Sequence, residues 1–293
     1  MIKWKGVILL LRPQQWVKNS FIFLPLFFGK KIGNFPELTE TLYAFIAFSL
    51  ITSSIYCLND LLDIKNDKLH PIKSKRPLAS GLINKITAIT ILLILLILAI
   101  LIFKIAHTNI QVIYFCTFYF FMNVAYCFYL KQFAILDIII ISVGFVIRLF
   151  IGGASSNTYL SHWIVIMTFL LALFLAIAKR KDDYTIYLKS GDKARKNVSR
   201  YNLEFINTVL SIVVTIILVS YIMYTVSPEV VKRIGSDYLY VTTIFVLLGL
   251  LRYLQLTIVD NKSGSPTKII FNDRFIQLSL IGWILIFSYF LYF

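Results

Sequence analysis

A membrane-length apolar run that ends in acidic residues occupies positions 40–67 and reads ETLYAFIAFSLITSSIYCLNDLLDIKND. After Glu40 the run carries no charged residue until Asp60, and Asp63 and Asp67 follow. About 20 apolar residues at a rise of about 1.5 Å each are enough for a helix to cross the hydrocarbon core of a bilayer. The pattern therefore predicts a transmembrane helix over residues 40–59 with acidic residues at one membrane surface.

The rest of the chain repeats this composition. Of the 293 residues, 59% are hydrophobic and 15% are charged, and the mean hydropathy is +0.81. Soluble domains carry about 25% charged residues, so a soluble globular protein is excluded. We predict a single all-α transmembrane domain over residues 1–293 with nine membrane-spanning helices, near residues 14–31, 40–59, 84–103, 109–130, 134–153, 161–179, 205–227, 237–257 and 274–293.

The basic residues predict the topology of this multi-pass cell-membrane protein. The formal net charge is +15, and most of the 29 Lys and Arg residues lie on one set of alternate loops. Because cytoplasmic loops are enriched in Lys and Arg, we expect the N-terminus and the loops at about 60–85 and 179–204 to be cytoplasmic, and the C-terminus to lie outside. Short basic clusters between apolar runs indicate anionic headgroups or phosphorylated substrates, and they argue against nucleic acid as a partner.

The acidic end of the 40–59 run has a spacing suited to metal binding. If the helix continues, Asp60, Asp63 and Asp67 fall at i, i+3 and i+7 on one face, with Asn59 beside them. Carboxylate and carboxamide oxygens are ligands for Mg²⁺, which bridges to substrate phosphates. A solvated helix end is the alternative, but an Asp near the bilayer core costs about 2.5–3.5 kcal/mol, so such acids are commonly functional. We expect all four residues to bind Mg²⁺, and the three aspartates to be catalytic.

A basic segment follows, which reads HPIKSKRPLASG at residues 70–81. Its two prolines and its glycine predict a rigid turn that presents Lys73 and Arg76 beside the acidic helix end. Metal-binding carboxylates next to Lys and Arg are typical of a site for a substrate with several phosphate groups. Positive-inside topology would also require basic residues here, but no particular spacing.

These two stretches resemble the signature of the UbiA-type prenyltransferase superfamily, N-D-x-x-D-x-x-x-D followed by R-P-L-x-x-G. Residues 11–19 (LRPQQWVKN), Leu136-Asp137 and the stretch 144–148 (GFVIR) are closest to its decaprenyl-phosphate phosphoribosyltransferase subfamily. The resemblance implies helices around a central cavity and a Mg²⁺-dependent transferase of cell-envelope biosynthesis at the inner membrane. The implied reaction transfers 5-phosphoribose from phosphoribosyl pyrophosphate to a polyprenyl phosphate and releases pyrophosphate.

The region after the sixth run departs from the second acidic signature of the superfamily. It reads KRKDDY at residues 179–184, which is similar to a K-R-x-x-acid pattern of the phosphoribosyltransferase subfamily. The resemblance makes Asp183 a metal ligand, and Asp182 and an ordinary solvated acid remain alternatives. The residues expected to hold the phosphates of donor and acceptor are Lys18, Asn59, Lys73, Arg76, Arg148, Lys179 and Arg180.

Arg148 lies within the fifth apolar run. We expect this intramembrane cation to bind a substrate anion, and pairing with an acidic side chain elsewhere in the helix bundle is the alternative. Asp137 shares its helix face, but it lies eleven residues, or about three turns, away. The neighbouring Gly144, Gly152 and Gly153 predict close packing of this helix against others.

Two other functions remain open. A transferase that moves a prenyl group from a prenyl diphosphate to an aromatic acceptor would share the first acidic motif, but it would need a second well-formed one. A transporter would favour inverted repeats and charges at the membrane midplane, and the two halves of this sequence show no repeat.

Overall fold

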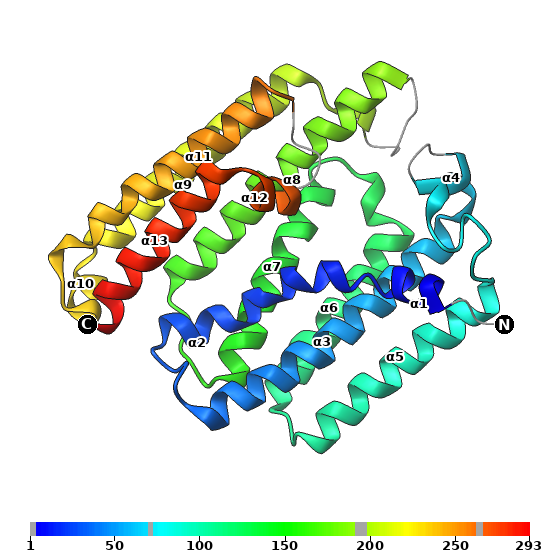
Figure 1. Ribbon diagram of the computed structural model, residues 1–293, viewed down its shortest axis with the longest axis horizontal. Coiled ribbons are helices and arrows are strands. Elements are labelled where there is room, and N and C mark those ends of the chain that lie inside the picture. Colours follow the sequence, from blue (N-terminus) through cyan, green and yellow to red (C-terminus); the bar gives the residue numbers. More distant parts are fainter. Residues whose placement is uncertain (1–3, 70–72, 191–197, 262–265) are drawn as a thin grey trace. The chain divides into compact units, whose positions relative to one another are not determined.

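The computed structural model describes residues 4–69, 73–190, 198–261 and 266–293, which form helices and contain no β-strand (Figure 1). Within these ranges eight helices are long and apolar enough to cross a membrane. They are α3 (Phe35–Leu62), α5 (Lys85–Ile105), α6 (Ile110–Phe128), α7 (Leu136–Ser155), α8 (His162–Ser190), α9 (Leu203–Val226), the 3₁₀ helix η5 (Asp237–Thr242) together with α11 (Thr243–Ile258), and α13 (Arg274–Tyr292). These helices confirm the second to ninth expected spans.

The first expected span, 14–31, is a broken segment rather than one helix. The N-terminal segment contains three short helices: α1 (Trp4–Leu11), the 3₁₀ helix η1 (Pro13–Phe23) and α2 (Leu24–Phe28). The expected span covers η1 and α2. Pro13 and Pro25 have no backbone N–H and therefore cannot continue a helical hydrogen-bond ladder. Arg12, between α1 and η1, adopts a left-handed conformation with φ 53°, which separates the two helices.

The two expected cytoplasmic loops also contain helix. The first holds α4 (Ile64–Leu69) and the 3₁₀ helix η2 (Lys73–Lys75). In the second, α8 continues to Ser190, so the expectation of a loop from residue 179 is wrong. Charged side chains are compatible with a helix once it leaves the apolar region, and Arg180 and Asp183 pair at i and i+3 along it. Four short helices complete the chain: η3 (Leu130–Gln132), η4 (Val198–Arg200), α10 (Pro228–Ile234) and α12 (Pro266–Asn272).

Asparagine and aspartate side chains cap several of the long helices. Asn84 accepts a hydrogen bond from Thr87 N at the start of α5, and Asn202 accepts one from Phe205 N at the start of α9, both at 2.7 Å. Asp273 does the same for α13. These caps satisfy N–H groups that have no partner within the helix, which fixes where each helix begins.

The chain divides into two compact units. Unit 1 comprises Met1–Lys131 and Gly144–Leu160, and unit 2 comprises Gln132–Val143 and Ser161–Phe293. Helix α7 therefore begins in unit 2 and ends in unit 1.

In unit 1, α3 packs against α1, α5, α6 and η1. Helix α7 approaches η1 so closely that a Cβ atom on Gly152 would lie 2.0 Å from the carbonyl oxygen of Ile22. A Cβ atom on Gly153 would lie 2.9 Å from the Leu160 side chain. The close packing expected from these glycines is confirmed.

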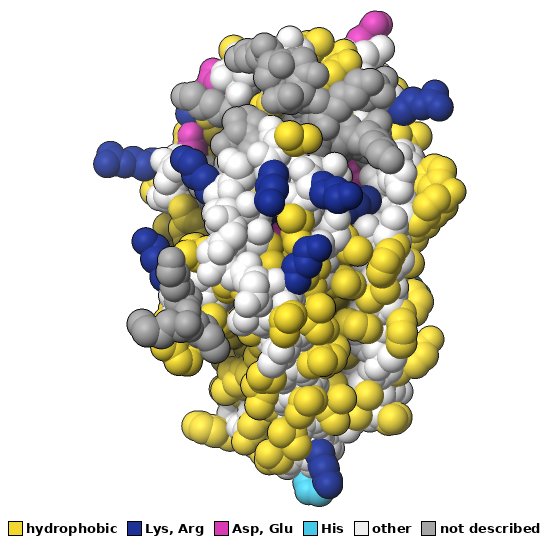
Figure 2. Space-filling view, turned by 90° about the vertical axis from the view of Figure 1, so that its right-hand side faces the viewer, with side chains coloured by type: hydrophobic (Ala, Val, Ile, Leu, Met, Phe, Trp, Pro, Cys, Tyr) yellow, Lys and Arg dark blue, Asp and Glu magenta, His cyan; other side chains and the backbone are white. Residues whose placement is uncertain are grey.

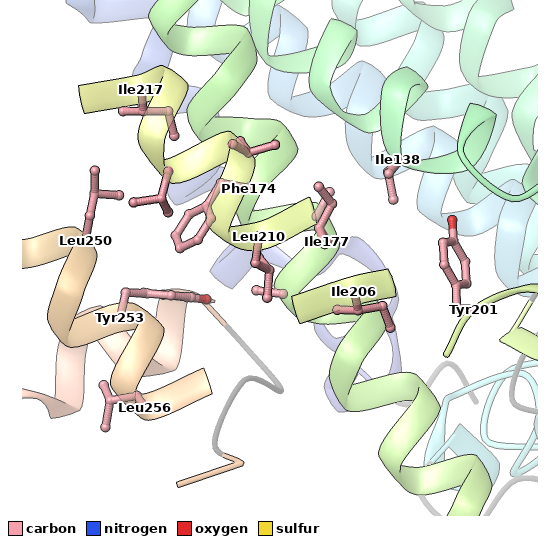
Figure 3. Close-up of a cluster of buried hydrophobic side chains, with 14 of the residues drawn as sticks. Ile138, Phe174, Ile177, Tyr201, Ile206, Leu210, Ile217, Leu250, Tyr253 and Leu256 are labelled. Atoms are coloured by element: carbon pink, nitrogen blue, oxygen red, sulfur yellow. The ribbon is translucent and has the colours of Figure 1, made fainter. Parts of the chain in front are cut away.

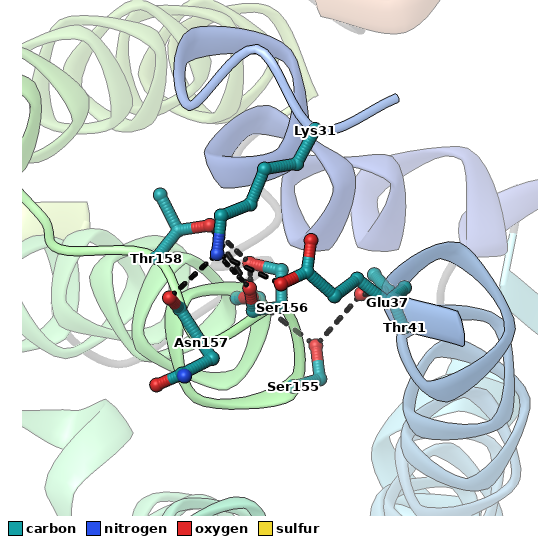
Figure 4. A network of polar contacts seen from close by, with 8 residues as sticks. Lys31, Glu37, Thr41, Ser155, Ser156, Asn157 and Thr158 are labelled. Carbon is teal, nitrogen blue, oxygen red and sulfur yellow. Dashed lines mark hydrogen bonds and ion pairs between the residues drawn. The ribbon is translucent and has the colours of Figure 1, made fainter. Parts of the chain in front are cut away.

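A polar cluster joins the start of α3 to the end of α7 (Figure 4). The Lys31 ammonium donates to Glu37 Oε1 at 2.9 Å and to the carbonyl oxygens of Ser156 and Asn157 at 3.0 and 2.8 Å. Lys31 therefore serves as an internal cation that ties three segments of unit 1 together, at the end of α3 opposite Asp60.

Helix α5 presents an apolar face outward. Ile86, Ile89, Leu93, Ile97 and Ile100 are exposed along it. The residues from 86 to 105 span about 30 Å, which matches the hydrocarbon thickness of a bilayer. Viewed from the side on which α5 lies, hydrophobic side chains cover the lower half of the surface and most Lys and Arg side chains gather above them (Figure 2). This face is therefore suited to contact with lipid.

In unit 2, the core lies among α7, α8, α9 and α11 (Figure 3). Phe174 of α8 meets Tyr253 of α11 edge-on, with ring centroids 5.2 Å apart. Ile206 and Leu210 of α9 are fully buried in the same cluster. Because lipid tails are as apolar as these side chains, close packing rather than exclusion from water stabilises such contacts.

Candidate active site

The three aspartates of the expected metal site lie at and just beyond the end of α3. Asp60 is in the last turn and is 1% exposed. The helix ends at Leu62, and Asp63 (φ −92°, ψ 4°) separates it from α4, which carries Asp67. The expected uninterrupted helical stripe is therefore wrong at Asp63, because the backbone leaves helical geometry there. Asp67 N still donates to Asp63 O at 2.8 Å, which keeps the motif in one compact turn.

Two arginines contact the buried aspartates. Arg12 Nη2 lies 2.6 Å from Asp60 Oδ1, and Arg76 Nη1 lies 3.1 Å from the same oxygen. Arg76 Nη1 also donates to Asp67 Oδ2 at 2.7 Å, so Arg76 bridges two acids of the motif. Burial raises the pKa of Asp67 above its ordinary value, although the charge of Arg76 opposes the shift. Arg76 thus favours the charged form of Asp67, against the effect of burial.

Lys131 is the partner of the third aspartate. Its ammonium donates to Asp63 Oδ1 at 2.7 Å and contacts Asn59 Oδ1 at 3.4 Å. Each aspartate of the motif therefore has a basic side chain within hydrogen-bonding distance.

Three of the four fixed positions of the R-P-L-x-x-G segment have separate structural roles. Arg76 points its guanidinium at the acids, whereas Leu78 is buried in a hydrophobic cluster with Leu10 and Cys57. Gly81 has φ +74°, a conformation that side-chain-bearing residues rarely adopt, and the chain turns there toward α5. The segment thus anchors Arg76 on one side and begins the next helix on the other.

The backbone of Arg12 is held in a sparsely populated conformation. A left-handed φ is uncommon for a residue other than glycine and persists only where the surroundings fix it. Ser53 Oγ donates to the carbonyl oxygen of Leu11 at 2.8 Å and accepts from Trp16 Nε1 at 3.0 Å, which holds both sides of Arg12 against α3. This arrangement directs the Arg12 guanidinium to Asp60.

The oxygens at this end of α3 fit a divalent cation. Asp60 Oδ2 is buried and has no hydrogen-bond partner among the residues that the structure describes. Leaving a buried polar atom unsatisfied costs about 1–3 kcal/mol. In the described ranges, the structure contains no group of three or more acidic, His or Cys side chains arranged to hold a metal ion. The aspartates instead pair with Arg12, Arg76 and Lys131. The carboxylate and carboxamide donor set is the one that Mg²⁺ prefers.

Unit 2 contains a second charged cluster, centred on Arg180. This residue is 1% exposed and binds Asp137 in two places, with Nε to Oδ2 at 2.7 Å and Nη2 to Oδ1 at 3.2 Å. Its Nη1 donates to Asp183 Oδ2. Arg180 is thus held by two carboxylates, and next to it Lys181 donates to Asn207 Oδ1 at 2.9 Å.

Arg148 occupies a nearly uncharged environment in unit 1. It is 5% exposed, and it donates through Nε to Asn19 Oδ1 (2.9 Å), through Nη1 to the Gly144 carbonyl (2.7 Å) and through Nη2 to Tyr119 Oη (3.1 Å). The rings of Phe48, Tyr119 and Phe145 lie 5.1 Å from its guanidinium carbon. No carboxylate in the described part of the chain pairs with it, and Asp137 binds Arg180 instead.

The UbiA prenyltransferase family matches residues 23–279. The chain belongs to this family. It is 30% identical to a decaprenyl-phosphate phosphoribosyltransferase of Mycolicibacterium smegmatis, over 95% of this chain and 90% of the relative. It is 27% identical to the protein of the same name from Mycobacterium tuberculosis, over 95% of this chain and 92% of the relative. This UbiA family member is therefore a membrane-bound transferase.

The fold agrees with the family. A UbiA homologue from Archaeoglobus fulgidus bound to GPP and Mg²⁺ superposes with a TM-score of 0.71 at 19% identity, covering 97% of this chain and 98% of that one. A digeranylgeranylglyceryl phosphate synthase superposes with a TM-score of 0.65 at 17% identity, covering 97% and 100%. At these identities the likeness establishes the fold alone.

The expected substrate-binding residues of this UbiA transferase fall into different environments. Arg76 and Asn59 lie with the aspartates, and Lys73 is partly exposed in η2. Lys179 is exposed on α8, whereas Arg180 is buried between two carboxylates. Residues 70–72, the start of the basic segment, lie outside the described residues.

Sequence reasoning missed several residues of both clusters. It assigned neither Arg12, which lies in the stretch 11–19 of the resemblance, nor Lys131 a role at the site, yet they contact Asp60 and Asp63. Asp137 belongs to the resemblance and was compared with Arg148 as a partner, but it binds Arg180. Pro13 directly after Arg12 was an available signal for a special backbone, whereas pairs that join residues many positions apart leave no mark in one sequence.

Proposed function

We propose that this UbiA family member transfers 5-phosphoribose from phosphoribosyl pyrophosphate to a polyprenyl phosphate, with release of pyrophosphate and with Mg²⁺ as cofactor. The observation that carries the proposal is the charge balance at the acidic end of α3. Three aspartates are matched there by Arg12, Arg76 and Lys131, and Lys18 and Arg148 in the same unit add two further cations. This excess suits reactants that bring three phosphorylated groups into one site.

The curated relatives support the same assignment, because their names specify a polyprenyl phosphate and a phosphoribosyl group. The family match runs through both units, so we propose that residues 1–293 act as one catalytic domain. The N-terminus and the acidic end of α3 would face the cytoplasm, where a phosphorylated sugar donor is available, and the C-terminus would lie outside.

In the proposed reaction the bond between ribose C1 and the pyrophosphate oxygen breaks, and a bond forms between C1 and an oxygen of the lipid phosphate. Within unit 1, Asn59, Asp60, Asp63 and Asp67 would hold Mg²⁺. When bound there, the metal neutralises charge on the leaving pyrophosphate. Asp60 has a carboxylate oxygen available for this purpose. In unit 2, Asp183 is also proposed as a metal ligand, on the resemblance of its K-R-x-x-acid pattern alone.

The basic residues would then change partners. Arg12, Arg76 and Lys131 each pair with an aspartate that a cation could satisfy instead, and they would turn to phosphate oxygens. Lys73 would add a further contact to the phosphates in unit 1, and Lys179 of unit 2 is proposed as a phosphate ligand on the resemblance alone. The lipid phosphate is already anionic, so attack on C1 requires positioning of the two reactants rather than a general base.

Arg180 has a different role in this proposal. Because both sides of its guanidinium are held by carboxylates, it would orient Asp183 rather than bind a phosphate. Asp137 would in turn orient Arg180.

A purified preparation given phosphoribosyl pyrophosphate, a polyprenyl phosphate and Mg²⁺ should form a phosphoribosylated lipid, and chelation should abolish it. The same preparation should also be given geranyl diphosphate with an aromatic acid, because the solved A. fulgidus homologue binds GPP. Prenylation of the acid together with no use of phosphoribosyl pyrophosphate would replace the proposal by the prenyl-transfer alternative. Family membership already removes the transporter alternative.

A further inference from the structure

Lys18 and Arg148 are two cations of unit 1 that are withdrawn from solvent and have no carboxylate partner among the described residues. Among the residues described, Lys18 makes no hydrogen bond or ion pair, and the donors of Arg148 reach only neutral oxygens. Both lie inward from Arg12, Arg76 and Lys131, which the three aspartates match. Lys18 and Arg148 therefore add positive charge away from the exposed surface that no described carboxylate balances.

The guanidinium of Arg148 has capacity for an anion. An arginine carries five N–H donors, and the structure engages one on each of the three nitrogen atoms. The aromatic rings around it compensate part of its charge, but they accept no full hydrogen bond. Two N–H groups are thus left for a ligand.

Tyr56 supplies a third unused donor. Its ring lies under the Arg12 guanidinium at 5.0 Å, and it interacts electrostatically with Arg148 and Tyr119. Its side chain is partly exposed, and its hydroxyl makes no hydrogen bond within the described ranges. Lys18 is also partly exposed, and its charge interacts with those of Arg148 and Arg12. Lys18, Tyr56 and Arg148 therefore share one region of unit 1.

Arg148 is separated from the metal end of α3, and Tyr56, four positions before Asp60 and under Arg12, lies part-way between them along α3. The Asn19 side chain, which accepts from Arg148, donates to Ser49 at 2.9 Å and Thr52 at 3.3 Å. These residues precede Asp60 by eight to eleven positions, which corresponds to about 12–16 Å along a helix. One pyrophosphate bound at Asp60 does not need cations at this depth.

We propose that Lys18, Tyr56 and Arg148 form a second anion subsite, which binds a phosphate monoester group. Such a group is doubly charged and has three acceptor oxygens, which matches two cations and a hydroxyl donor. The inference rests on the proposed function for its two sources: the 5-phosphate of the sugar donor, which lies at the opposite end from its pyrophosphate, or the phosphate of the lipid acceptor.

A purely structural role for Arg148 would leave the Lys18 ammonium and the Tyr56 hydroxyl without a task, since neither makes a hydrogen bond among the described residues. The test therefore uses Lys18→Met and Tyr56→Phe, which remove a charge and a hydroxyl without breaking a described hydrogen bond. Lys104→Met, at the exposed end of α5, and Tyr43→Phe, exposed near the start of α3, are the matched controls.

Binding of ribose 5-phosphate, of a short-chain polyprenyl phosphate and of pyrophosphate with Mg²⁺ should be measured on each purified full-length variant, together with KM for both substrates. We expect Lys18→Met to weaken one phosphate monoester about tenfold or more and Tyr56→Phe about fivefold, as for hydrogen bonds to charged groups. Pyrophosphate binding and both controls should stay within about twofold of wild type.

Weaker ribose 5-phosphate binding with a raised donor KM assigns the subsite to the sugar donor. Weaker polyprenyl phosphate binding with a raised acceptor KM supports the subsite and assigns it to the lipid. If neither ligand binds the wild type, or if both variants bind both ligands as the wild type does, the subsite is wrong. Because these binding measurements need no turnover, they decide the subsite even if phosphoribosyl transfer itself is not observed.

Discussion

Asp60 is the residue on which the interactions of the acidic motif converge. Its Oδ1 receives two arginines, while its buried Oδ2 has no partner in the described residues. Arg12 reaches it from a left-handed turn, and Arg76 reaches it from the anchored segment that follows α4. A single carboxylate thus connects the N-terminal segment, α3 and the basic segment, and it also retains an oxygen for a cation.

We expect Asp60→Asn and Asp63→Asn each to lower the transfer rate at least about 10²-fold, because each removes a metal ligand and with it transition-state charge stabilisation. Rates should be measured at moderate Mg²⁺, with thermal unfolding to verify that each variant is folded. Asp237→Asn, an exposed aspartate in η5, is the control and should retain activity. Near-normal turnover of either motif variant would exclude the metal assignment.

Arg180 should behave as a structural residue rather than a phosphate ligand. Removing one partner of a buried ion pair leaves an uncompensated charge and costs about 3–5 kcal/mol. Arg180→Ala should therefore lower the thermal unfolding midpoint in detergent, whereas Lys179→Ala on the exposed side of α8 should not. A folded Arg180→Ala variant of unchanged stability, with only a raised donor KM, would restore Arg180 as a substrate ligand.

At the scale of the element, α7 depends on contacts that only glycine permits. Gly152→Ala should destabilise the protein by about 1–3 kcal/mol, because the added methyl would overlap the backbone oxygen of Ile22, which cannot rotate away. Gly249→Ala in α11 meets only an ordinary contact at 3.8 Å, so it should be neutral or stabilising. Equal unfolding midpoints for the two variants would contradict the close approach of α7 and η1.

Hydropathy and length were sufficient to place eight helices, because a membrane-spanning helix needs a long apolar run whatever it packs against. The helix break at Arg12 and Pro13 could also be predicted from the sequence, since proline cannot continue a helix. The ion pairs Lys131–Asp63 and Arg180–Asp137 could not be predicted, because they depend on how segments far apart in the sequence pack together. The acidic motif was located correctly, but its turn at Asp63 is set by tertiary contacts rather than by helix propensity.

At the scale of the whole molecule, the basic loops predict a cytoplasmic N-terminus and an external C-terminus. A reporter that is active only in the cytoplasm should therefore give no signal when fused after Phe293 and a clear signal when fused before Met1. A bright C-terminal fusion would break the predicted topology and would move the acidic end of α3 to the opposite side of the membrane.

Donor labelling tests the central claim most directly. Phosphoribosyl pyrophosphate labelled in the ribose, and separately in the β-phosphate, should be incubated with the purified protein, Mg²⁺ and a polyprenyl phosphate. We predict that ribose label enters the lipid while the β-phosphate label is released as pyrophosphate in equal amount, and that Asp60→Asn prevents both. Transfer of the β-phosphate label to the lipid, or no labelled lipid from a preparation that prenylates an aromatic acid, would contradict phosphoribosyl transfer.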